Sequence, residues 1–460
     1  MNAVATKLGE LKLELTGELI LPPDPGYDEA RAIWNAMIDR RPAMIVRCAN
    51  TADVVRAVNY ARDHHMLVSV RGGGHNVAGS ALNDGGMVID LSAMKCVHVH
   101  ADSKRAVVEA GALLADVDAA TQVHHLATPL GINSTTGIAG LTLGGGFGWL
   151  SRKHGMTVDN LIAAEVVTAD GRVVHASAEK HPDLFWALRG GSGNFGVVTR
   201  FEFRLHEVGP NVLAGFIVYP MSEAKSVLKQ YREFVAQAPD DLTVWSVLRN
   251  APPLPFLPES VHGTGVVVLA MMHAGDPAQG EAIIDPLRRF GTPVGEHVGV
   301  MPYTAWQQVL DPLLAPRARN YWKSHNFKTL EDGLFDVMVD TASALPSPQC
   351  EMILASMGGA TARAATEATA YPHRDALFVV NVHARWEDPA DDARCIAWAR
   401  EFYRAGARYS TGGVYVNFQT EDEKERVHAA YGSNYNRLAR VKRIYDPANV
   451  FRVNQNIQPE

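Results

Sequence analysis

The chain has 460 residues, 47% of them hydrophobic and 20% charged, which is ordinary for a globular protein and long enough for two domains. A net charge of −7 argues against nonspecific binding to nucleic acid or to an anionic membrane surface. Residues 1–18 lack the apolar core of a signal peptide, and no apolar run is long enough to span a bilayer. The four cysteines are far apart and form no CxxC pair, so we expect a cytoplasmic protein.

The first 200 residues alternate between strand-like and helix-like stretches. Apolar runs predict strands at 43–48, 67–70 and 87–91, and a helix capped by Asn50 is expected between the first two. Together they form a strand–helix–strand unit. Asp170-Gly171 is a strong hairpin signal. Further strands are expected at 106–110, 164–168, 172–175 and 201–205, and a further helix at 113–124.

The pattern changes near residue 209, where longer strands alternate with longer helices. This mixture predicts a mostly antiparallel sheet with helices packed on one face. The expected strands are 213–219, 242–248, 265–272, 351–356 and 377–383, and the expected helices are 223–237, 279–290, 335–342 and 391–405.

The hexapeptide Arg71-Gly72-Gly73-Gly74-His75-Asn76 directly follows the predicted strand 67–70. Glycines in such a turn let the backbone approach a large anionic ligand and expose N–H donors to it. A histidine within the turn is well placed to bind the ligand or to bond with it covalently.

A second glycine-rich run, 131–148, has seven glycines in eighteen residues. It is typical of a phosphate-binding loop. A flexible linker is the alternative, although Ile138, Leu141, Leu143 and Phe147 would anchor the segment, unlike a Gly/Ser linker. A Rossmann fingerprint fits weakly, and a Walker A loop is excluded because no Gly-Lys-Ser/Thr follows.

Two further regions add to this pattern. Asp159-Asn160 and the run 190–198 contribute more polar and glycine turns to the N-terminal part. The C-terminal residues 431–457 are rich in aromatic and amide side chains, which is not the composition of a disordered tail. We expect this tail to pack back onto the first domain.

With these motifs in this order, the chain resembles the berberine-bridge-enzyme-like branch of the vanillyl-alcohol-oxidase (PCMH-type) FAD-linked oxidoreductases, bacterial type. The resemblance runs nearly end to end. It implies an α+β fold with a PCMH-type FAD-binding domain at 1–208, a substrate-binding domain at 209–410 and a segment at 411–460 that returns to the FAD domain. It is carried by residues 71–75, 131–148, 159–160, 194–199, 415–417 and 446–455.

In this family FAD is attached through the histidine of the first motif, which corresponds to His75. Many members add a cysteine tether at the position where this chain has Asn133, so the resemblance implies covalent attachment through His75 only. His124, His125, His262 and His273 show no metal-ligand spacing, and no metal is expected. The expected FAD contacts are Arg71, Gly72, Gly73, Gly74, His75, Asn76, Ser80, Gly131, Thr135, Thr136, Gly137, Gly140, Gly144, Gly145, Asn160, Val198, Tyr415, Asn417 and Asn454.

The resemblance further implies hydride transfer from a small alcohol, sugar, amine or secondary metabolite to flavin N5. A side chain would assist by removing a proton from an adjacent O–H or N–H. Oxygen would then reoxidise the flavin and yield hydrogen peroxide, and Thr136 at the family's oxygen-access position favours such an oxidase. A dehydrogenase with another electron acceptor and a flavin-bearing binding protein without turnover are the alternatives. The oligomeric state is not predicted.

The catalytic base does not transfer from the family. Plant members carry Tyr-x-Asn-Tyr, whereas this chain has Phe418 after Tyr415-Val416-Asn417, so the second hydroxyl is absent. If 320–325 is a strand, Tyr321 and Lys323 share one face and Trp322 and Ser324 the other.

Lys323 is the preferred candidate base, with a surface lysine as the alternative reading. Tyr321, Tyr371 and Asn417 complete the expected catalytic set. His373-Arg374 is interpreted as a structural hydrogen-bonding corner.

Overall fold

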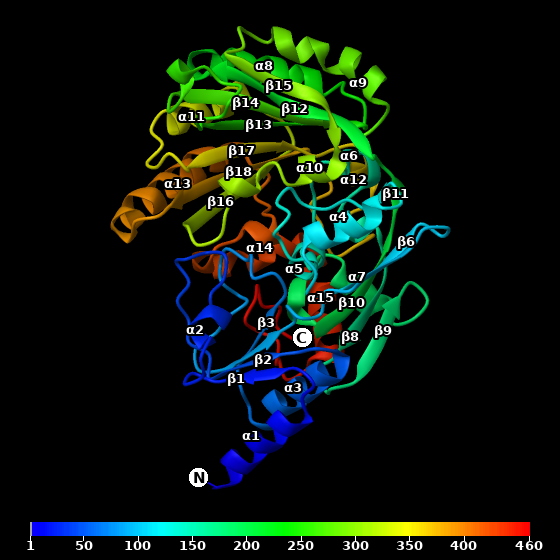
Figure 1. The fold of residues 1–460 in the computed structure, drawn as a ribbon. Helices are drawn as coiled ribbons and strands as arrows, with labels where there is room; N and C mark the ends of the chain where they lie inside the picture. Colours follow the sequence, from blue (N-terminus) through cyan, green and yellow to red (C-terminus); the bar gives the residue numbers. More distant parts are fainter. Residues whose placement is uncertain (1) are drawn as a thin grey trace.

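The computed structural model describes residues 2–460, with side chains for 8–423 and 425–460. The middle of the chain forms the upper body in Figure 1, and the two ends of the chain form the lower body, where both termini lie. Within residues 2–460 no helix combines the length and apolar character that a membrane span requires.

The lower body contains a four-stranded sheet in which β2, β4 and β3 are parallel and β1 is antiparallel to β2. Asn50 caps α3 by accepting a hydrogen bond from the Asp53 N–H, and α3 buries Val54, Ala57, Val58 and Ala61 along one face. The elements are α1 (Asn2–Glu14), β1 (Glu18–Ile20), α2 (Tyr27–Ala30), β2 (Met44–Arg47), α3 (Thr51–Asp63), β3 (Val68–Arg71) and β4 (Met87–Asp90).

A five-stranded antiparallel sheet, in the order β5-β6-β10-β8-β9, completes this body. Helix α3 packs between the two sheets, because it contacts β4 of the first and both β8 and β10 of the second. The strands are β5 (Val97–His100), β6 (Arg105–Glu109), β8 (Leu161–Val167), β9 (Val173–Ser177) and β10 (Val197–Arg204). The other elements are α4 (Leu114–Gln122), β7 (Leu126–Ala127), α5 (Ile138–Leu143), α6 (Ser151–His154), α7 (Pro182–Leu188) and β11 (His206–Glu207).

The upper body is one seven-stranded antiparallel sheet in the order β15-β12-β14-β13-β17-β18-β16. Its strands are β12 (Asn211–Pro220), β13 (Leu242–Asn250), β14 (Gly265–His273), β15 (Gly295–Pro302), β16 (Arg319–Phe327), β17 (Glu351–Ser356) and β18 (Phe378–Trp386). Its helices are α8 (Ala224–Val235), α9 (Pro277–Ile284), α10 (Tyr303–Gln307), α11 (Asp332–Ala342), α12 (Ala360–Arg363) and α13 (Asp392–Gly406).

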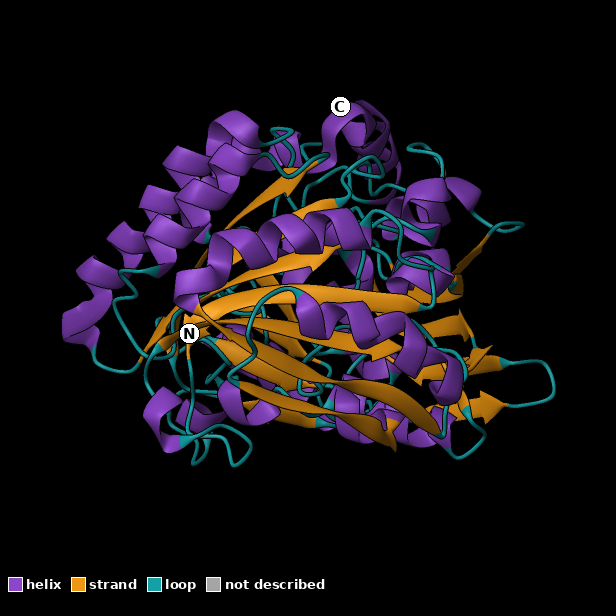
Figure 2. Ribbon diagram, turned by 90° about the horizontal axis from the view of Figure 1, so that it is seen from above, coloured by secondary structure: helices purple, strands orange, loops and turns teal. Residues whose placement is uncertain are grey.

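The two faces of this sheet have different partners. Helices α8, α11 and α13 pack on the outer face and share one hydrophobic core with it. The view from above shows helices lying across the strands (Figure 2). The inner face packs against the lower body, with Trp245, Ile353 and Val379 in one core with Phe147 and Tyr415. The predicted α+β class, with a mostly antiparallel sheet backed by helices, is confirmed.

The C-terminal segment returns to the lower body through α14 (Val427–Tyr431) and α15 (Tyr435–Tyr445) (Figure 1). Lys442 is fully buried, and its ammonium donates to the carbonyls of Asn194 and Phe451 and to the carboxylate of Asp446. The proposed domain boundaries near 208 and 410 stay a prediction. They are supported by the lower core, which, apart from Ala370, combines residues before 206 with residues after 413.

Most predicted elements are present within one or two residues, including the 170–171 hairpin between β8 and β9. Other features differ, and the predicted strand at 201–205 and helix at 279–290 have different bounds, Val197–Arg204 and Pro277–Ile284. The glycine-rich run contains the short helix α5, and α1 and β15 were not expected. Strand β15 is half-exposed at the sheet edge and has mixed polar residues, so its sequence lacks the alternation that indicates a strand.

The stacked imidazoles of His154 and His206, with ring centroids 3.9 Å apart, generate a prediction about pH. Burial lowers the pKa of His154 to about 3 and that of His206 to about 4. Below the ordinary histidine pKa of 6.5, the unfolded chain therefore binds more protons than the folded protein does. The contribution of the two neutral imidazoles to the free energy of unfolding is fully present above pH 6.5 and is lost as the pH falls towards 4. The loss is at most about 1.4 kcal/mol per pH unit for each histidine.

Urea unfolding at pH 7 and pH 5 tests this. We expect the double variant His154→Gln/His206→Gln to lose less stability between these pH values than the unchanged protein does. A variant of the exposed His175, His175→Gln, is the control and should keep the original slope. Equal slopes in all three proteins would contradict the prediction.

Candidate functional site

A cavity of about 310 Å³ lies between the lower body and the inner face of the seven-stranded sheet. Turns and strand ends from distant parts of the sequence line it. On the lower side the lining residues come from the segments 68–76, 131–141, 192–198, 415–418 and 451–455, not all of whose residues reach the cavity, and on the sheet side they include Trp245, Trp322, Ile353, Ala355, Val379, Asn381 and His383.

The turn after β3 forms one wall of the cavity. Gly72, Gly73 and Gly74 all line it, and Gly74 has a left-handed φ of 68°. A Cβ at Gly73 would lie 2.4 Å from the backbone nitrogen of Gly137, and a Cβ at Gly137 would lie 2.3 Å from that of Gly73. The two glycine-rich motifs therefore touch through their backbones, which only glycine at both positions permits.

His75 sits where these two motifs meet. Its ring stacks on the indole of Trp34 with centroids 4.7 Å apart, and its Nε2 lies 2.8 Å from Thr135 Oγ1. Asn133 Oδ1 accepts hydrogen bonds from the Thr135 N–H and hydroxyl, which fixes that hydroxyl. Burial, with a smaller contribution from the charge of Arg385, lowers the pKa of His75 to about 3. The imidazole is therefore neutral at physiological pH, with a nitrogen lone pair available.

Tyr415 and Asn417 line another part of the cavity wall and hold it in place through hydrogen bonds. The Tyr415 hydroxyl accepts from the Gly146 N–H at 2.9 Å, and Asn417 Nδ2 donates to the same hydroxyl and to the carbonyl of Gly140. Both side chains therefore hold the glycine-rich run 131–148 in place, and both line the cavity.

The residues present fit a large dinucleotide such as FAD. Space is open around the Cα atoms of Gly140 and Gly193, where side chains would enter the cavity. The side-chain carbonyl oxygens of Asn454 and Gln455 at the cavity wall are buried and have no hydrogen-bond partner in the described part of the chain. Among the described lining residues there is no Lys or Arg, so backbone N–H groups, hydroxyls and amides would meet a diphosphate.

Several residues expected to contact the cofactor lie behind the wall. Arg71 donates to the carbonyl of Ala30, and Asn160 donates to the carbonyls of His154 and Met156. All the residues expected at the cofactor site divide into two groups. Gly72, Gly73, Gly74, His75, Asn76, Ser80, Gly131, Thr136, Gly137, Gly140, Val198, Tyr415, Asn417 and Asn454 line the cavity, whereas Arg71, Thr135, Gly144, Gly145 and Asn160 do not.

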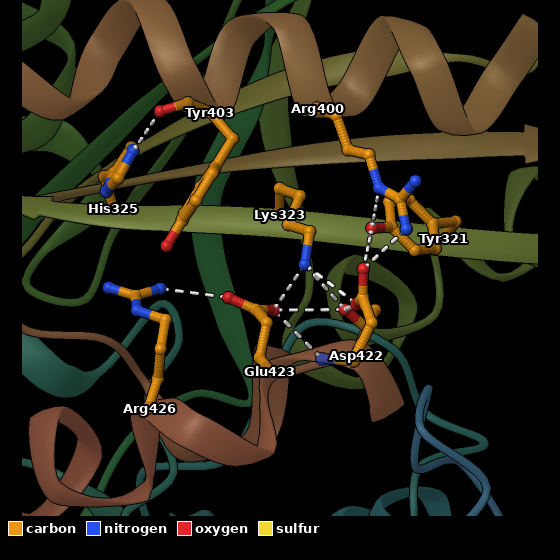
Figure 3. A network of polar contacts seen from close by, with 9 residues as sticks. Tyr321, Lys323, His325, Arg400, Tyr403, Asp422, Glu423 and Arg426 are labelled. Atoms are coloured by element: carbon orange, nitrogen blue, oxygen red, sulfur yellow. Dashed lines mark hydrogen bonds and ion pairs between the residues drawn. The ribbon is translucent and has the colours of Figure 1, made fainter.

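The expected base, Lys323, points away from the cavity. Its strand parity is as predicted, because Trp322 faces the cavity while Tyr321 and Lys323 face the other side of β16. Lys323 Nζ donates to Asp422 Oδ1 at 3.0 Å and lies 3.1 Å from Glu423 Oε2 (Figure 3). The geometry corrects the expected role: Lys323 joins the upper sheet to the C-terminal segment and does not face a substrate.

The neighbours of Lys323 share this structural arrangement. The Tyr321 hydroxyl donates to Asp422 at 2.6 Å and accepts from Arg400, and Arg426 pairs with Glu423 at 2.9 Å (Figure 3). The carboxylates belong to the short helix at Glu421–Arg426, which follows the cavity-lining residues 415–418. This cluster of charges therefore holds the segment that carries Tyr415 and Asn417.

Tyr371 is also behind the wall, where its ring packs on Gly145 and on Tyr415 with centroids 6.1 Å apart. The adjacent corner is structural, in agreement with the sequence interpretation. His373 lies 3.0 Å from the carbonyl of Ala430, and Arg374 makes a bidentate pair with Asp159. Of the four expected catalytic residues, only Asn417 reaches the cavity.

The sheet side of the cavity was not predicted from sequence. Trp245 and Trp322 supply aromatic surface there, Trp34 and Phe418 add to it from the lower body, and Asn381 and His383 supply polar groups. The alternation of residues in β18 indicates two faces but does not say which one meets a ligand.

The cluster around Lys323 yields a prediction about stability. Replacement by methionine should lower the free energy of unfolding by about 3 kcal/mol, because Glu423 is 2% exposed and loses a cation. This value is at the low end of the usual cost of breaking a buried ion pair, because Arg400 still contacts Asp422 and Arg426 still contacts Glu423. Chemical denaturation measures the loss.

Lys328→Met is the matched control, since Lys328 pairs with Asp375 in an exposed position and should cost about 1 kcal/mol or less. A catalytic base at position 323 would give the opposite pattern: unchanged stability with turnover lost.

Comparison with known proteins agrees with this site. A family model described as "FAD binding domain" matches residues 42–177, and one described as "Berberine and berberine like" matches residues 414–458. The chain is 33% identical to (R)-6-hydroxynicotine oxidase of Paenarthrobacter nicotinovorans, over 97% of this chain and 98% of that one. It is 29% identical to chitooligosaccharide oxidase of Gibberella zeae, over 100% of this chain and 96% of that one.

A solved structure shows the same fold. The crystal structure of 6-hydroxy-D-nicotine oxidase from Arthrobacter nicotinovorans superposes with a TM-score of 0.88 at 32% identity, covering 97% of this chain and 99% of that one. Because the agreement in sequence and fold extends over nearly the whole chain and both family models match in their expected places, this protein is an FAD-linked oxidoreductase of the berberine-bridge-enzyme-like family.

Proposed function

We propose that the protein is an oxidase that removes a hydride from a small aromatic alcohol or amine and carries FAD on a single covalent bond to His75. The observation that supports this most strongly is the neutral, half-buried imidazole of His75, which lines the cavity at the junction of the two glycine-rich motifs. Bound FAD would supply the two-electron acceptor. The chain's own residues bind it, orient it and exclude water.

The proposed bond requires a nucleophilic ring nitrogen on His75 directed towards the cofactor. The low pKa keeps the ring unprotonated, and stacking on Trp34 and the contact with Thr135 restrict its orientation. Such a bond to the flavin 8α carbon would prevent loss of the cofactor and make it a stronger oxidant.

The proposal of a single tether rests on what stands in place of the family's cysteine. Asn133 occupies that position at the cavity wall and is already engaged with Thr135. Among the described residues that line the cavity there is no cysteine. His75 is then the residue through which this chain would attach FAD.

The wall composition favours an aromatic substrate over a saccharide. Three tryptophans and three phenylalanines line the cavity, and the polar side chains on the sheet side are those of Asn381 and His383. A sugar would need many hydrogen-bonding partners, whereas flat apolar surfaces suit a planar ring with one or two polar groups. The relative named for hydroxynicotine oxidation fits this choice better than the one named for chitooligosaccharides.

The bond to His75 is tested by acid precipitation of the purified holoenzyme. In the unchanged protein we expect the yellow colour to stay with the pellet, and in His75→Ala to move into the supernatant. The exposed His175→Ala serves as control and should keep a yellow pellet. Covalent flavin retained by the His75→Ala pellet would overturn the assignment.

Oxygen use is tested separately. After photoreduction of the holoenzyme without air, mixing with aerated buffer should restore the oxidised flavin spectrum and yield one hydrogen peroxide per flavin. A flavin that stays reduced in air but is reoxidised by a quinone would establish the dehydrogenase alternative instead. The cytoplasmic location expected from the sequence stays a prediction.

A further inference from the structure

A row of four side chains crosses the inner face of the seven-stranded sheet. The strand registers pair Arg249 with Glu351, Glu351 with His383, and His383 with Trp322, on the neighbouring strands β13, β17, β18 and β16. Directly paired residues project from the same face of a sheet, so the four form one continuous row. The row ends at the cavity, where His383 and Trp322 are part of the wall.

The row is buried and charged. Arg249 donates to Glu351 Oε2 at 2.7 Å, and Glu351 Oε1 lies 3.3 Å from His383 Nδ1, within ion-pair distance but not aligned as a hydrogen bond. Burial raises the pKa of Glu351, but Arg249, His383 and Arg385 lower it further, and the net pKa lies below the ordinary value. Glu351 is therefore a carboxylate facing the imidazole, and it would stabilise a proton acquired there.

The other ring nitrogen of His383 faces the cavity side of the sheet. Nε2 lies 2.7 Å from Asn381 Nδ2, a contact in which the amide donates and the imidazole nitrogen accepts. With Nε2 as acceptor, the ring proton is on Nδ1, towards Glu351. The Asn381 carbonyl oxygen is buried and has no hydrogen-bond partner among the described residues, so the site also offers an acceptor to a ligand O–H or N–H.

Stacking fixes the plane of the imidazole. The rings of His383 and Trp322 are parallel within 7°, with centroids 4.2 Å apart. With Glu351 on one nitrogen and Trp322 on one face, His383 has the arrangement of a general base whose orientation is held by a carboxylate. Lys323 cannot share this role, because it lies on the opposite face of β16.

We propose that His383 is the proton acceptor of the oxidation, with Glu351 and Arg249 as positioning residues. The inference rests on the proposed function and adds its missing base. An aromatic substrate would displace the Asn381 amide from His383 Nε2 and place there the O–H or N–H next to its oxidised carbon. The O–H or N–H bond breaks and its proton goes to Nε2, the hydrogen of the neighbouring C–H bond leaves with the bonding electrons as hydride to the FAD oxidant, and a C=O or C=N bond forms.

The test uses 4-nitrophenol as the probe, because its phenol and phenolate forms absorb at different wavelengths and it can bind without being oxidised. The holoenzyme is titrated with it at several pH values and followed by difference spectroscopy. We expect saturable binding, with the bound probe ionising at least about one pH unit lower than in free solution, a tenfold change in ionised fraction. Glu351→Gln should reduce this shift.

His383→Asn should abolish the shift or the binding. His325→Asn is the matched control: His325 is another buried histidine of the same sheet, but it contacts the carbonyl of Tyr403 on the outer face, and its variant should bind and ionise the probe normally. The proposal is overturned if the unchanged holoenzyme does not bind the probe, or if His383→Asn ionises it equally well.

Failure of this inference is distinguishable from failure of the proposed function. Covalent flavin and its reoxidation by air are measured without the probe and without His383. A yellow acid pellet together with an unshifted probe would remove the role of His383 alone. A colourless pellet would remove the His75 bond whatever the probe shows.

Discussion

The backbone contact between Gly73 and Gly137 is the constraint on which the rest of the site depends. It brings the turn after β3 against the start of α5, two segments more than sixty residues apart in sequence. This contact brings Thr135 beside His75, whose other contact, the stack on Trp34, lies within the first motif's own surroundings. Any Cβ at either glycine would separate the motifs and open the wall where the ligand must lie.

The upper sheet contributes through its register. Arg249, Glu351, His383 and Trp322 form a row because four strands pair in one alignment. A slip of one residue in β18 would turn His383 towards the helices and bring Val382, part of the outer core, to the cavity. The apolar outer core under α8, α11 and α13 therefore specifies the chemistry of the inner face as well as the stability of the sheet.

The lower part of the site was largely predictable from the sequence, and the upper part was not. The turn at 71–76 and the run 131–148 carry glycines whose spacing indicates close backbone approach, and both line the cavity. The parity of β16 was also predictable, since Tyr321 and Lys323 share a face. Which face meets the ligand is set by the packing of α13 and by the carboxylates of residues 422–423, far away in sequence.

His383 was missed for the same reason. Neither Glu351 nor Arg249 is near it in sequence, and strand pairing over long separations leaves no local signal. In the sequence of β18, His383 is followed by Ala384 and Arg385, and nothing in this local pattern distinguishes it from an ordinary core position. The signal that could have found it is the pair of polar residues, Asn381 and His383, two apart on one face of a strand predicted to be buried.

The buried ammonium of Lys442 has a consequence for biosynthesis. Its partner Asn194 is 248 residues earlier in the chain, and Asn194 adjoins the cavity wall at Gly193. At a synthesis rate of about 5–20 residues per second, roughly 12–50 seconds separate the emergence of these two partners from the ribosome. During that interval the upper sheet can form from contiguous chain, while the lower body lacks its last core layer. The part of the cavity wall that comes from residues 451–455 is therefore in place only when translation is almost complete.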